Sequence, residues 1–587
     1  MEITRRGLLG ASAAAGAGLL MPLRLPMAAN AAIPLGVTAF TEQLPTLAQM
    51  GVIDATKGGT AKIHMVNARH SFHRAMGNTP TFAYRSDGGV QDYLGPVIVA
   101  KRNVPFNLTV VNELGVHPLA NAVDTGIMGT TDLDRTAPRA SVHLHGGNTD
   151  PANDGDPLDS FGHGKSRTYH YGNTQEAAGL WYHDHALGIT RLNVFAGLAS
   201  GYLVRDANDP GDGSVLPAPP YEVPLILQDR TFAEKGTFDY PASPWRPEFF
   251  GDVATVNGKI MPNLNVDRGK YRFRVYNGSN ARFYNLRFMS RSTALPFFQI
   301  GTDGGLLNRP VRLTILLLAP GERADLVVDF AELAKGATVI LSNDAAEPYP
   351  AGDPCAVTQI MQFTGTGARG WTKPLTVLRD LRSKTDRITR LAGRRVDKTR
   401  SMTLVEVHDA LTGEPTMVLM NNRNFMPMDG IPMEGMSTVK SNALEEWELI
   451  NTTIDAHPMH LHFAQFQVIN RQAIDRDSYY AAAGYDDHVA GSGLFPPPAV
   501  GPYLTAGSSP RPPAANEVGW KDTVVCLPGE VTRIRIPFGP NAVPNPWMRG
   551  RYLPMAIGAS HTGRYVSHCH ILEHEENDMM MRFTIEK

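Results

Sequence analysis

Short runs in which apolar and polar residues alternate, separated by Gly, Pro, Asn and Asp, dominate the chain beyond residue 31. A period of two predicts strands that place one face on a core. Three clear examples, each ending in a polar turn, are 105–112 (PFNLTVVN), 270–277 (KYRFRVYN) and 445–451 (EEWELIN). Long stretches with the helical period are scarce. The pattern therefore predicts an all-β protein.

A repeated motif divides this β pattern into units. A Pro-Gly-Glu turn followed by an alternating strand occurs at 318–330 and again at 526–538. This repeat indicates duplicated β-sandwiches, and 587 residues exceed one ordinary core. We expect three Greek-key sandwich units at 32–208, 215–378 and 401–587. A Gly/Pro/Asp linker precedes the second unit, and a basic, solvated connector at 379–400 precedes the third.

The first 31 residues have the pattern of an export signal. Arg5-Arg6 and Leu8-Leu9 precede an Ala/Gly/Leu run, and Ala29-Asn30-Ala31 is a small-x-small cleavage site. The arginine pair favours the twin-arginine pathway over an ordinary secretory signal or anchor. We therefore expect a periplasmic or extracellular protein. No other segment is long and apolar enough to span a bilayer.

Charge and cysteine content narrow the function classes. A formal net charge of −2 gives no basic field for nucleic acid or an anionic membrane. The three cysteines, Cys355, Cys526 and Cys569, form a poor disulfide framework. Cys355 and Cys526 either pair or stay free, and two buried thiols are favoured.

The stretch His568-Cys569-His570 carries the clearest chemistry. Successive side chains of a strand point to opposite faces, so the two histidines face away from the cysteine. A blue-copper site combines a thiolate, two imidazoles and a thioether. His574 and Met579 follow Cys569 at suitable offsets, with Met580 as the neighbouring alternative. The histidines require another metal on the far side of the strand.

Three further His-x-His pairs support a cluster of metals. A single pair is most often a coincidence, but four pairs presenting eight imidazoles would suit several copper ions. His457, offset from the third-unit pair, supplies the missing imidazole of the blue site. The pairs are His143 and His145, His183 and His185, His460 and His462, and His568 and His570.

The sequences of these segments resemble those of the multicopper oxidases. The segments are HLHGG, WYHDHALGITRLNVFAGL, HPMHLH, GWKDTV and HCHILEHEENDMM. They are most similar to the group of bacterial spore-coat laccases, bilirubin oxidases and phenoxazinone synthases. The resemblance covers nearly the whole mature chain and implies three cupredoxin domains holding four copper ions. It implies the following ligands: His457, Cys569, His574 and axial Met579 for type 1; His143 and His460 for type 2; and His145, His183, His185, His462, His568 and His570 for the type 3 pair.

The resemblance also implies a mechanism. A small reducing substrate gives single electrons to the type 1 copper, and they cross the Cys569 backbone to three coppers that reduce dioxygen to water. Oxygen reduction consumes protons, so carboxylates are needed nearby. Glu575 and Asp154 match acidic positions of the group, the alternative being solvated surface carboxylates. Asp184 is expected to orient a ligand or to accept turn hydrogen bonds.

Domains one and three must then meet, leaving the middle unit as a spacer. The other histidines considered (His64, His70, His73, His117, His163, His170 and His408) are expected to be surface or strand residues. We expect a monomer, because one chain completes the cluster.

Two segments depart from the group. Five methionines lie between Met420 and Met436, and thioethers either bind Cu(I) or fill a gap beneath a loop. An insertion at 541–561 precedes the copper strand, so substrate preference cannot be inherited across it. Three functions compete: a laccase-type oxidase of phenols, aminophenols or bilirubin-like pigments; a metallo-oxidase of Cu(I) or Mn(II) for metal tolerance; and a copper store or electron carrier. The complete histidine set favours the enzymes.

Overall fold

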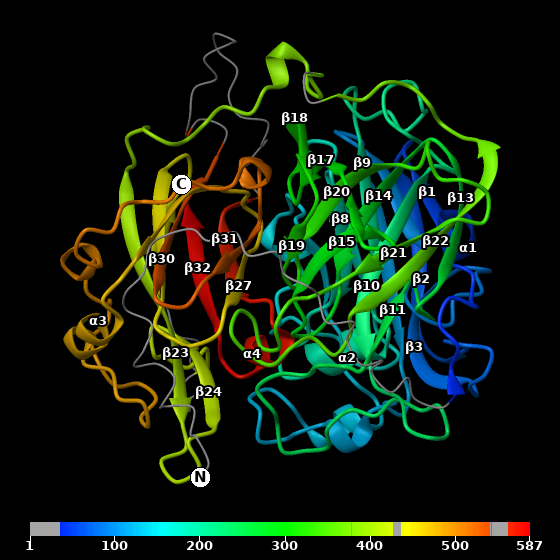
Figure 1. The fold of residues 1–587 in the computed structure, drawn as a ribbon. Coiled ribbons are helices and arrows are strands. Elements are labelled where there is room, and N and C mark those ends of the chain that lie inside the picture. Colours follow the sequence, from blue (N-terminus) through cyan, green and yellow to red (C-terminus); the bar gives the residue numbers. More distant parts are fainter. Residues whose placement is uncertain (1–35, 377–378, 427–435, 540–541, 543–560) are drawn as a thin grey trace, which may run out of the picture. The chain divides into compact units, whose positions relative to one another are not determined.

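A computed structural model describes residues 36–376, 379–426, 436–539, 542 and 561–587. The predicted export signal and nearly all of the predicted 541–561 insertion lie outside these residues. Within them, strands pair into six sheets, two for each stretch of sequence that we expected to form a unit (Figure 1). The predicted all-β class is confirmed. No described helix is long and apolar enough to cross a membrane.

The first pair of sheets uses residues 52–205. Its sheets have the orders β1-β4-β9-β8-β6 and β3-β2-β5-β7. The elements are α1 (Leu47–Met50), β1 (Val52–Ala55), β2 (Gly59–His70), β3 (Thr79–Ser86), β4 (Val97–Lys101), β5 (Phe106–Glu113), β6 (Val142–His145), β7 (Ser166–Tyr171), β8 (Gly179–Asp184), α2 (Thr190–Ala196) and β9 (Ala199–Arg205). In β5, buried and partly exposed residues alternate, as its sequence predicts.

The second pair uses residues 222–369, with the orders β12-β11-β10-β14-β20-β17-β18 and β13-β22-β21-β15-β16, and β19 pairs with β15. Its strands are β10 (Glu222–Arg230), β11 (Val253–Val256), β12 (Lys259–Ile260), β13 (Asn263–Arg268), β14 (Lys270–Asn277), β15 (Tyr284–Ser290), β16 (Thr293–Leu295), β17 (Phe297–Thr302), β18 (Gly305–Leu313), β19 (Leu316–Leu318), β20 (Arg323–Asp329), β21 (Thr338–Ser342) and β22 (Gln359–Arg369).

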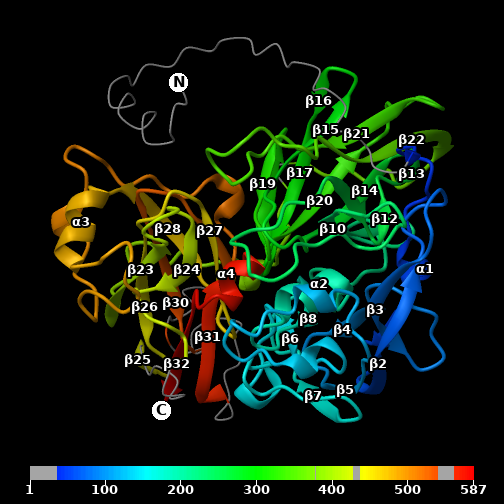
Figure 2. The same cartoon turned by 90° about the horizontal axis from the view of Figure 1, so that it is seen from below.

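The third pair uses residues 398–586, with the orders β24-β23-β26-β30-β28 and β25-β32-β31-β27-β29. Its elements are β23 (Lys398–His408), β24 (Pro415–Met420), β25 (Met436–Lys440), β26 (Leu444–Asn451), β27 (His457–Leu461), β28 (Gln467–Ala473), α3 (Arg476–Ala483), β29 (Thr523–Cys526), β30 (Glu530–Pro537), β31 (Gly563–Cys569), α4 (Leu572–Glu576) and β32 (Met580–Glu586). Figure 2 shows α4 next to β31.

All three pairs share one topology. In one sheet, two parallel strands are followed by an antiparallel partner: β2, β5 and β7; β10, β14 and β20; and β23, β26 and β30. In the other sheet, a parallel pair leads to two antiparallel strands: β4, β9, β8 and β6; β13, β22, β21 and β15; and β25, β32, β31 and β27. This correspondence supports the duplication inferred from the sequence. The exact boundaries of the three units stay predictions.

Alternation in β14 has a different cause from alternation in β5. Arg272 and Arg274 alternate with apolar residues, but both are buried. They join Arg205, Asp209, Glu222 and Asp325 in an ionic cluster of three arginines and three carboxylates, with hydrogen-bond N–O distances of 2.6–3.2 Å around the two β14 arginines. The polar face of this strand is therefore not a solvent face.

The predicted solvated connector at 379–400 is partly buried. Leu381 and Leu391 lie in apolar clusters, and the buried Arg382 forms an ion pair with Glu176 of the first sheet pair. β23 begins at Lys398, inside the predicted connector. Only part of the connector is therefore exposed, because the side chains of Leu381, Arg382 and Leu391 are buried.

Candidate metal centres

Two pairs of corresponding strands position all four His-x-His motifs: β6 contains both of its histidines, and β8, β27 and β31 each end immediately before the second histidine. β6 and β8 lie side by side in the first unit, with His143 opposite His183. β27 and β31 lie side by side in the third unit, with His460 opposite His568. Because the four strands occupy matching positions in their sheets, the two units present matching sets of imidazoles. The middle unit's counterparts, β15 and β21, contain no histidine.

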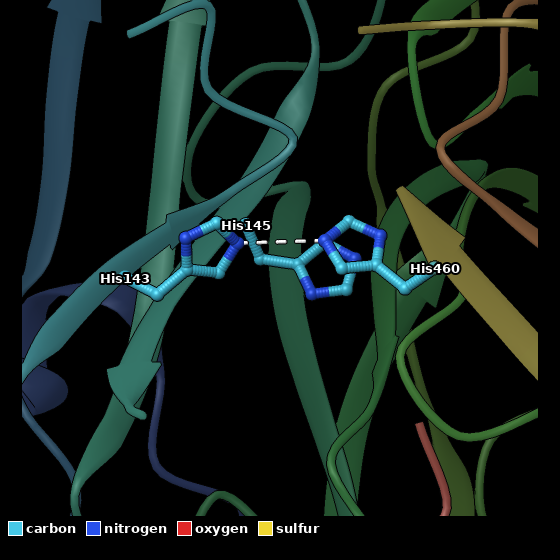
Figure 3. Close-up of side chains that lie close together, drawn as sticks. All are labelled: His143, His145 and His460. Carbon is cyan, nitrogen blue, oxygen red and sulfur yellow. Dashed lines mark hydrogen bonds between the residues drawn. The ribbon is translucent and has the colours of Figure 1, made fainter. Parts of the chain in front are cut away.

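The imidazoles of both units meet in three groups. One joins His145 and His183 to His570, a second joins His185 to His462 and His568, and in each group the ligand atoms lie within 4.8 Å of one another. The third brings His143 Nε2 to 3.4 Å from His460 Nε2, with the His145 ring stacked on His460 at 3.6 Å (Figure 3). Exchanging the two units maps the first group onto the second, and the third onto itself.

Hydrogen bonds leave the ring nitrogens free for metal in the second group. The Nδ1–H of His462 donates to Asp154 Oδ2 over 2.6 Å, and that of His568 donates to the Cys569 carbonyl over 3.0 Å. Their Nε2 atoms therefore carry lone pairs, and these lie 3.1 Å apart and 3.2 Å from His185 Nε2. Converging lone pairs repel, so a cation between them fits this geometry.

The other groups have the same character. Among the described residues, His145 Nδ1, His183 Nε2 and both His570 nitrogens are buried without a hydrogen-bond partner. His143 and His460 each donate through Nδ1 to a main-chain carbonyl, of Asp154 and Asp522, leaving Nε2 free. Such orphaned nitrogens are costly unless they bind something.

Burial keeps these rings neutral. It lowers the pKa of His183 to about 3 and that of His457 to about 4. Burial, reinforced by neighbouring imidazoles, holds the pKa well below 6.5 in six more rings of the cluster: His143, His145, His185, His460, His462 and His570. Neutral imidazole is the form that binds metal.

A separate site surrounds Cys569. Its sulfur lies 3.7 Å from the Nδ1 atoms of His457 and His574, which are 3.2 Å from each other. The Nε2–H of His457 donates to Thr453 Oγ1, which leaves Nδ1 for a metal. Thiolate and imidazole are suitable copper ligands. The two neighbours of Cys569 in the chain belong to the other groups, as strand alternation predicts.

Packing distinguishes the two methionine candidates. Met579 lies in the apolar cluster that contains Cys569, and its carbonyl accepts the Cys569 N–H over 2.9 Å. Met580 packs in a different cluster, with Leu187, Phe425 and Val566. Met420 and Met426 also contact apolar clusters, whereas Met428 and Met433 lie outside the described residues.

Both predicted acids lie beside the histidines. Glu575 is buried, with Oε1 3.3 Å from His185 Nδ1 and Oε2 3.1 Å from His568 Nδ1. Asp154 contacts His462 through its carboxylate and His143 through its carbonyl. Burial raises the pKa of Asp154 to about 7. Neither is the solvated surface carboxylate of the alternative.

Asp184 occupies in the first unit the place that Cys569 has in the third. Five and ten residues after Cys569 come His574 and Met579, whereas Ile189 and Val194 stand at those offsets from Asp184. The carboxylate accepts hydrogen bonds from the main chain of Ser141 and Ala186 and from Asn193. Asp184 is thus a turn acceptor, and the first unit has no thiolate, imidazole or thioether at the three positions that correspond to Cys569, His574 and Met579.

The structure corrects two expectations. His73 and His117 are buried rather than on the surface, and their nitrogens contact Thr41 and Asn193 respectively. The middle unit is also not merely a spacer. Its Arg323 forms a double hydrogen bond with Asp522, whose Oδ1 lies 3.1 Å from His145 Nε2. The GWKDTV motif signalled Asp522, but sequence gave no sign of its partner.

The remaining cysteines are unpaired. Cys355 is partly exposed and Cys526 is buried, and neither forms a disulfide. The Sγ of Cys355 instead accepts a hydrogen bond from Asn343 over 3.0 Å. The structure thus agrees with two thiols rather than a disulfide, but only Cys526 is buried as predicted.

Comparisons with known proteins agree with this geometry. Residues 134–209 and 402–587 match the family described as multicopper oxidase. The chain is 34% identical to a laccase of Bacillus subtilis over 92% of this chain and 97% of the relative. It is 33% identical to multicopper oxidase LPR1 of Arabidopsis thaliana over 92% of each.

Among solved structures, McoA multicopper oxidase from Aquifex aeolicus superposes with a TM-score of 0.70 at 23% identity, covering 94% of this chain and all of that one. This similarity supports the three-domain fold. The matched family, the extended sequence identity and the converging histidines lead to one conclusion. This chain belongs to the multicopper oxidases, copper oxidoreductases that use dioxygen as electron acceptor.

Proposed function

We propose that this protein is a laccase-type oxidase that takes single electrons from phenolic, aminophenolic or bilirubin-like donors and reduces dioxygen to water. The observation that carries the proposal is the one-residue separation of two kinds of site along β31. Cys569 faces the His457 and His574 site, and His568 and His570 face the histidine groups. One peptide bond on each side of Cys569 therefore connects the donor side to the oxygen side.

We propose four copper ions, held as the resemblance implies. His457, Cys569, His574 and Met579 hold the type 1 ion, and His143 and His460 hold the type 2 ion. The type 3 pair divides between His145, His183 and His570 on one side and His185, His462 and His568 on the other. When bound, copper supplies one-electron exchange with the donor and the four-electron reduction of dioxygen.

The residues around the copper ligands supply protons and orient the ligand rings. Glu575 contacts both His185 and His568, which places a carboxyl group that can pass protons at the edge of the cluster where oxygen reduction consumes them. Asp154 fixes the ring of His462 by accepting its Nδ1–H. Burial of every ligand side chain excludes bulk water from both kinds of site.

Aromatic residues support the phenolic donor. Trp245, Phe250 and Tyr349 of the middle unit are partly exposed and pack against the apolar cluster that contains Cys569 and Met579. The Nε1–H of Trp245 donates to the carbonyl of Glu573, directly before His574. An aromatic donor stacked here lies close to the type 1 ligands. The relative from Bacillus subtilis that is named a laccase supports the same donor class.

Oxygen uptake by the copper-loaded protein tests the donor class. A methoxyphenol is offered in one cell and Cu(I) in another. Faster uptake with the phenol, and no peroxide released, supports the laccase function. Preference for Cu(I), lost when Met426, Met428, Met433 and Met436 are changed to Ser, contradicts it and supports the metallo-oxidase. Blue protein without uptake from either donor supports an electron carrier.

We also propose twin-arginine export and a monomeric state. The Arg5-Arg6 pair supports the first, and completion of every histidine group within one chain supports the second. Replacing both arginines with lysine should retain the protein in the cytoplasm. Light scattering on the purified protein should give a mass near 63.9 kDa less the cleaved signal.

A further inference from the structure

Buried charges connect the middle unit to the histidine cluster. Three of them, Glu322, Arg323 and Lys521, line a cavity of about 310 Å³ that is bounded by residues of the second and third units. Lys521 Nζ lies 2.8 Å from Asp303 and 2.9 Å from Glu322. Beyond them, the guanidinium of Arg323 donates to both oxygens of Asp522 over 2.6 Å. This chain of ion pairs ends at copper-site histidines.

Asp522 transmits the position of Arg323 to His145. The carboxylate oxygen Oδ1 lies 3.1 Å from His145 Nε2, which places the proton on Nε2. The lone pair then resides on Nδ1, the nitrogen that is otherwise unpartnered and lies near His183 and His570. If the Asp522 carboxylate rotated, His145 would no longer be held in this tautomer. The two hydrogen bonds that Arg323 donates to the carboxylate prevent that rotation.

Gly321, two residues before Arg323, meets the same group from another side. Its φ is +81°, and a Cβ there would lie 2.6 Å from His570 Cγ. The His570 ring cannot retreat freely, because it packs 4.9 Å from the His145 ring and 5.4 Å from the His183 ring. Absence of a side chain at Gly321 therefore sets where the ring of His570 lies.

The glycine after His145 completes the arrangement. A Cβ at Gly146 would lie 2.5 Å from Arg323 Nη2 and 2.6 Å from Asp522 Oδ2. The first unit thus leaves room for an ion pair built by the second and third units. All three contacts act on the group of His145, His183 and His570, and Asp522 also accepts the Nδ1–H of His460 through its carbonyl.

We propose that the turn 319–323 (APGER) of the middle unit is a positioning element for this group, with Arg323 acting through Asp522 and Gly321 acting on His570. The trinuclear site is then assembled by three units, although only two supply ligands. This inference rests on the proposed copper sites. It gives a function to one of the two Pro-Gly-Glu turns, which the duplication alone leaves unexplained.

Gly529, in the second Pro-Gly-Glu turn, and Arg471, in β28, offer matched controls. Gly529 has a φ of +66° but no atom within 4 Å of a Cβ position. Arg471 lines the same cavity and forms a double ion pair with Glu517, yet neither residue has a hydrogen bond to a copper-site histidine. Gly321→Ala is thus compared with Gly529→Ala, and Arg323→Met with Arg471→Met.

Copper retention during chelator titration of the loaded proteins is the main measurement, with electron paramagnetic resonance as the second. We expect Arg323→Met and Gly321→Ala to lower the affinity of the group of His145, His183 and His570 for copper by about 10–100-fold. Loss of one of the two coupled type 3 copper ions would leave the other uncoupled. The amount of copper detected by electron paramagnetic resonance should therefore increase. The blue colour should persist, which shows that the third unit is folded. Arg323→Lys should recover part of the affinity.

Both control variants should match the wild type. Equal copper retention in Arg323→Met, Gly321→Ala and wild type would overturn the proposal, as would equal losses in the controls. If the wild type itself binds no copper outside the blue site, the proposed function fails instead, so the two failures are distinguishable.

Discussion

At the scale of single residues, the spacing of ligands could be read from the sequence, but their tautomers could not. Alternation alone separated Cys569 from His568 and His570, because neighbouring strand residues point to opposite faces. Which nitrogen of each ring is free depends on distant partners, such as Asp154 for His462 and Asp522 for His145. Those partners are 308 and 377 residues away in sequence, so no local pattern reveals them.

Glu575 is the first residue to test. Glu575→Gln keeps the shape of the side chain but removes a proton donor beside His185 and His568. Turnover should fall by about 100-fold or more, while copper content and blue colour stay unchanged. Steady-state oxygen uptake measures the effect. Glu530→Gln, which alters a carboxylate paired with Arg511, serves as control. Unchanged turnover in Glu575→Gln would remove its proposed role.

Trp245 tests the donor surface. Trp245→Ala removes an aromatic face next to the type 1 ligands, and stacking contributes about 0.5–1.5 kcal/mol. The KM for a methoxyphenol should therefore rise about two- to twelve-fold, with the kcat for oxygen consumption nearly constant. Trp371→Ala alters a tryptophan bonded to Gly213 and should have no such effect. A KM that stays at the wild-type value would place the donor elsewhere.

At the scale of elements, the alternating runs predicted strands correctly. For β14, however, the polar face was expected to face solvent and is buried. In β5 the polar face is partly exposed, whereas Arg272 and Arg274 of β14 lie in the buried ionic cluster. Both sequences alternate in the same way. The difference arises because Asp209 and Glu222, from neighbouring segments, neutralise the arginines in the interior.

Breaking the ionic cluster should destabilise the fold. Arg272→Met leaves Asp209 and Asp325 with fewer partners in a buried site, which costs about 3–5 kcal/mol. Chemical denaturation of the copper-free protein measures the free energy of unfolding. Arg309→Met removes a comparable arginine from an exposed pair with Asp380 and should change little. A loss below about 1 kcal/mol in Arg272→Met would contradict this account.

The same cluster should make stability sensitive to acid. Arg205, Arg274 and Arg272 outweigh the burial of Glu222 and lower its pKa from 4.5 to about 2. A depressed carboxyl pKa stabilises the fold above the unfolded value and loses that effect as pH falls toward the folded value. The free energy of unfolding should therefore decrease between pH 4.5 and about 2. Glu222→Gln should flatten this decrease, and an equally steep decrease in the variant would contradict the assignment.

At the scale of the whole molecule, three units with one topology have diverged in what their corresponding strands carry. The first and third present matching imidazoles from β6, β8, β27 and β31, and only the third keeps the thiolate. The resemblance to the family implied that these two units must meet. It did not show that the middle unit reaches the cluster through Arg323, because an arginine in a strand is most often a surface residue.

The ratio of donor oxidised to dioxygen consumed tests the central claim, that Cys569 on β31 connects a donor site to a site of complete oxygen reduction. The measurement uses copper-loaded protein, a methoxyphenol and a peroxide assay. We predict about four one-electron oxidations per dioxygen and no peroxide, with both signals lost in Cys569→Ser. A ratio near two with peroxide released, or an unchanged ratio and rate in Cys569→Ser, would contradict the account.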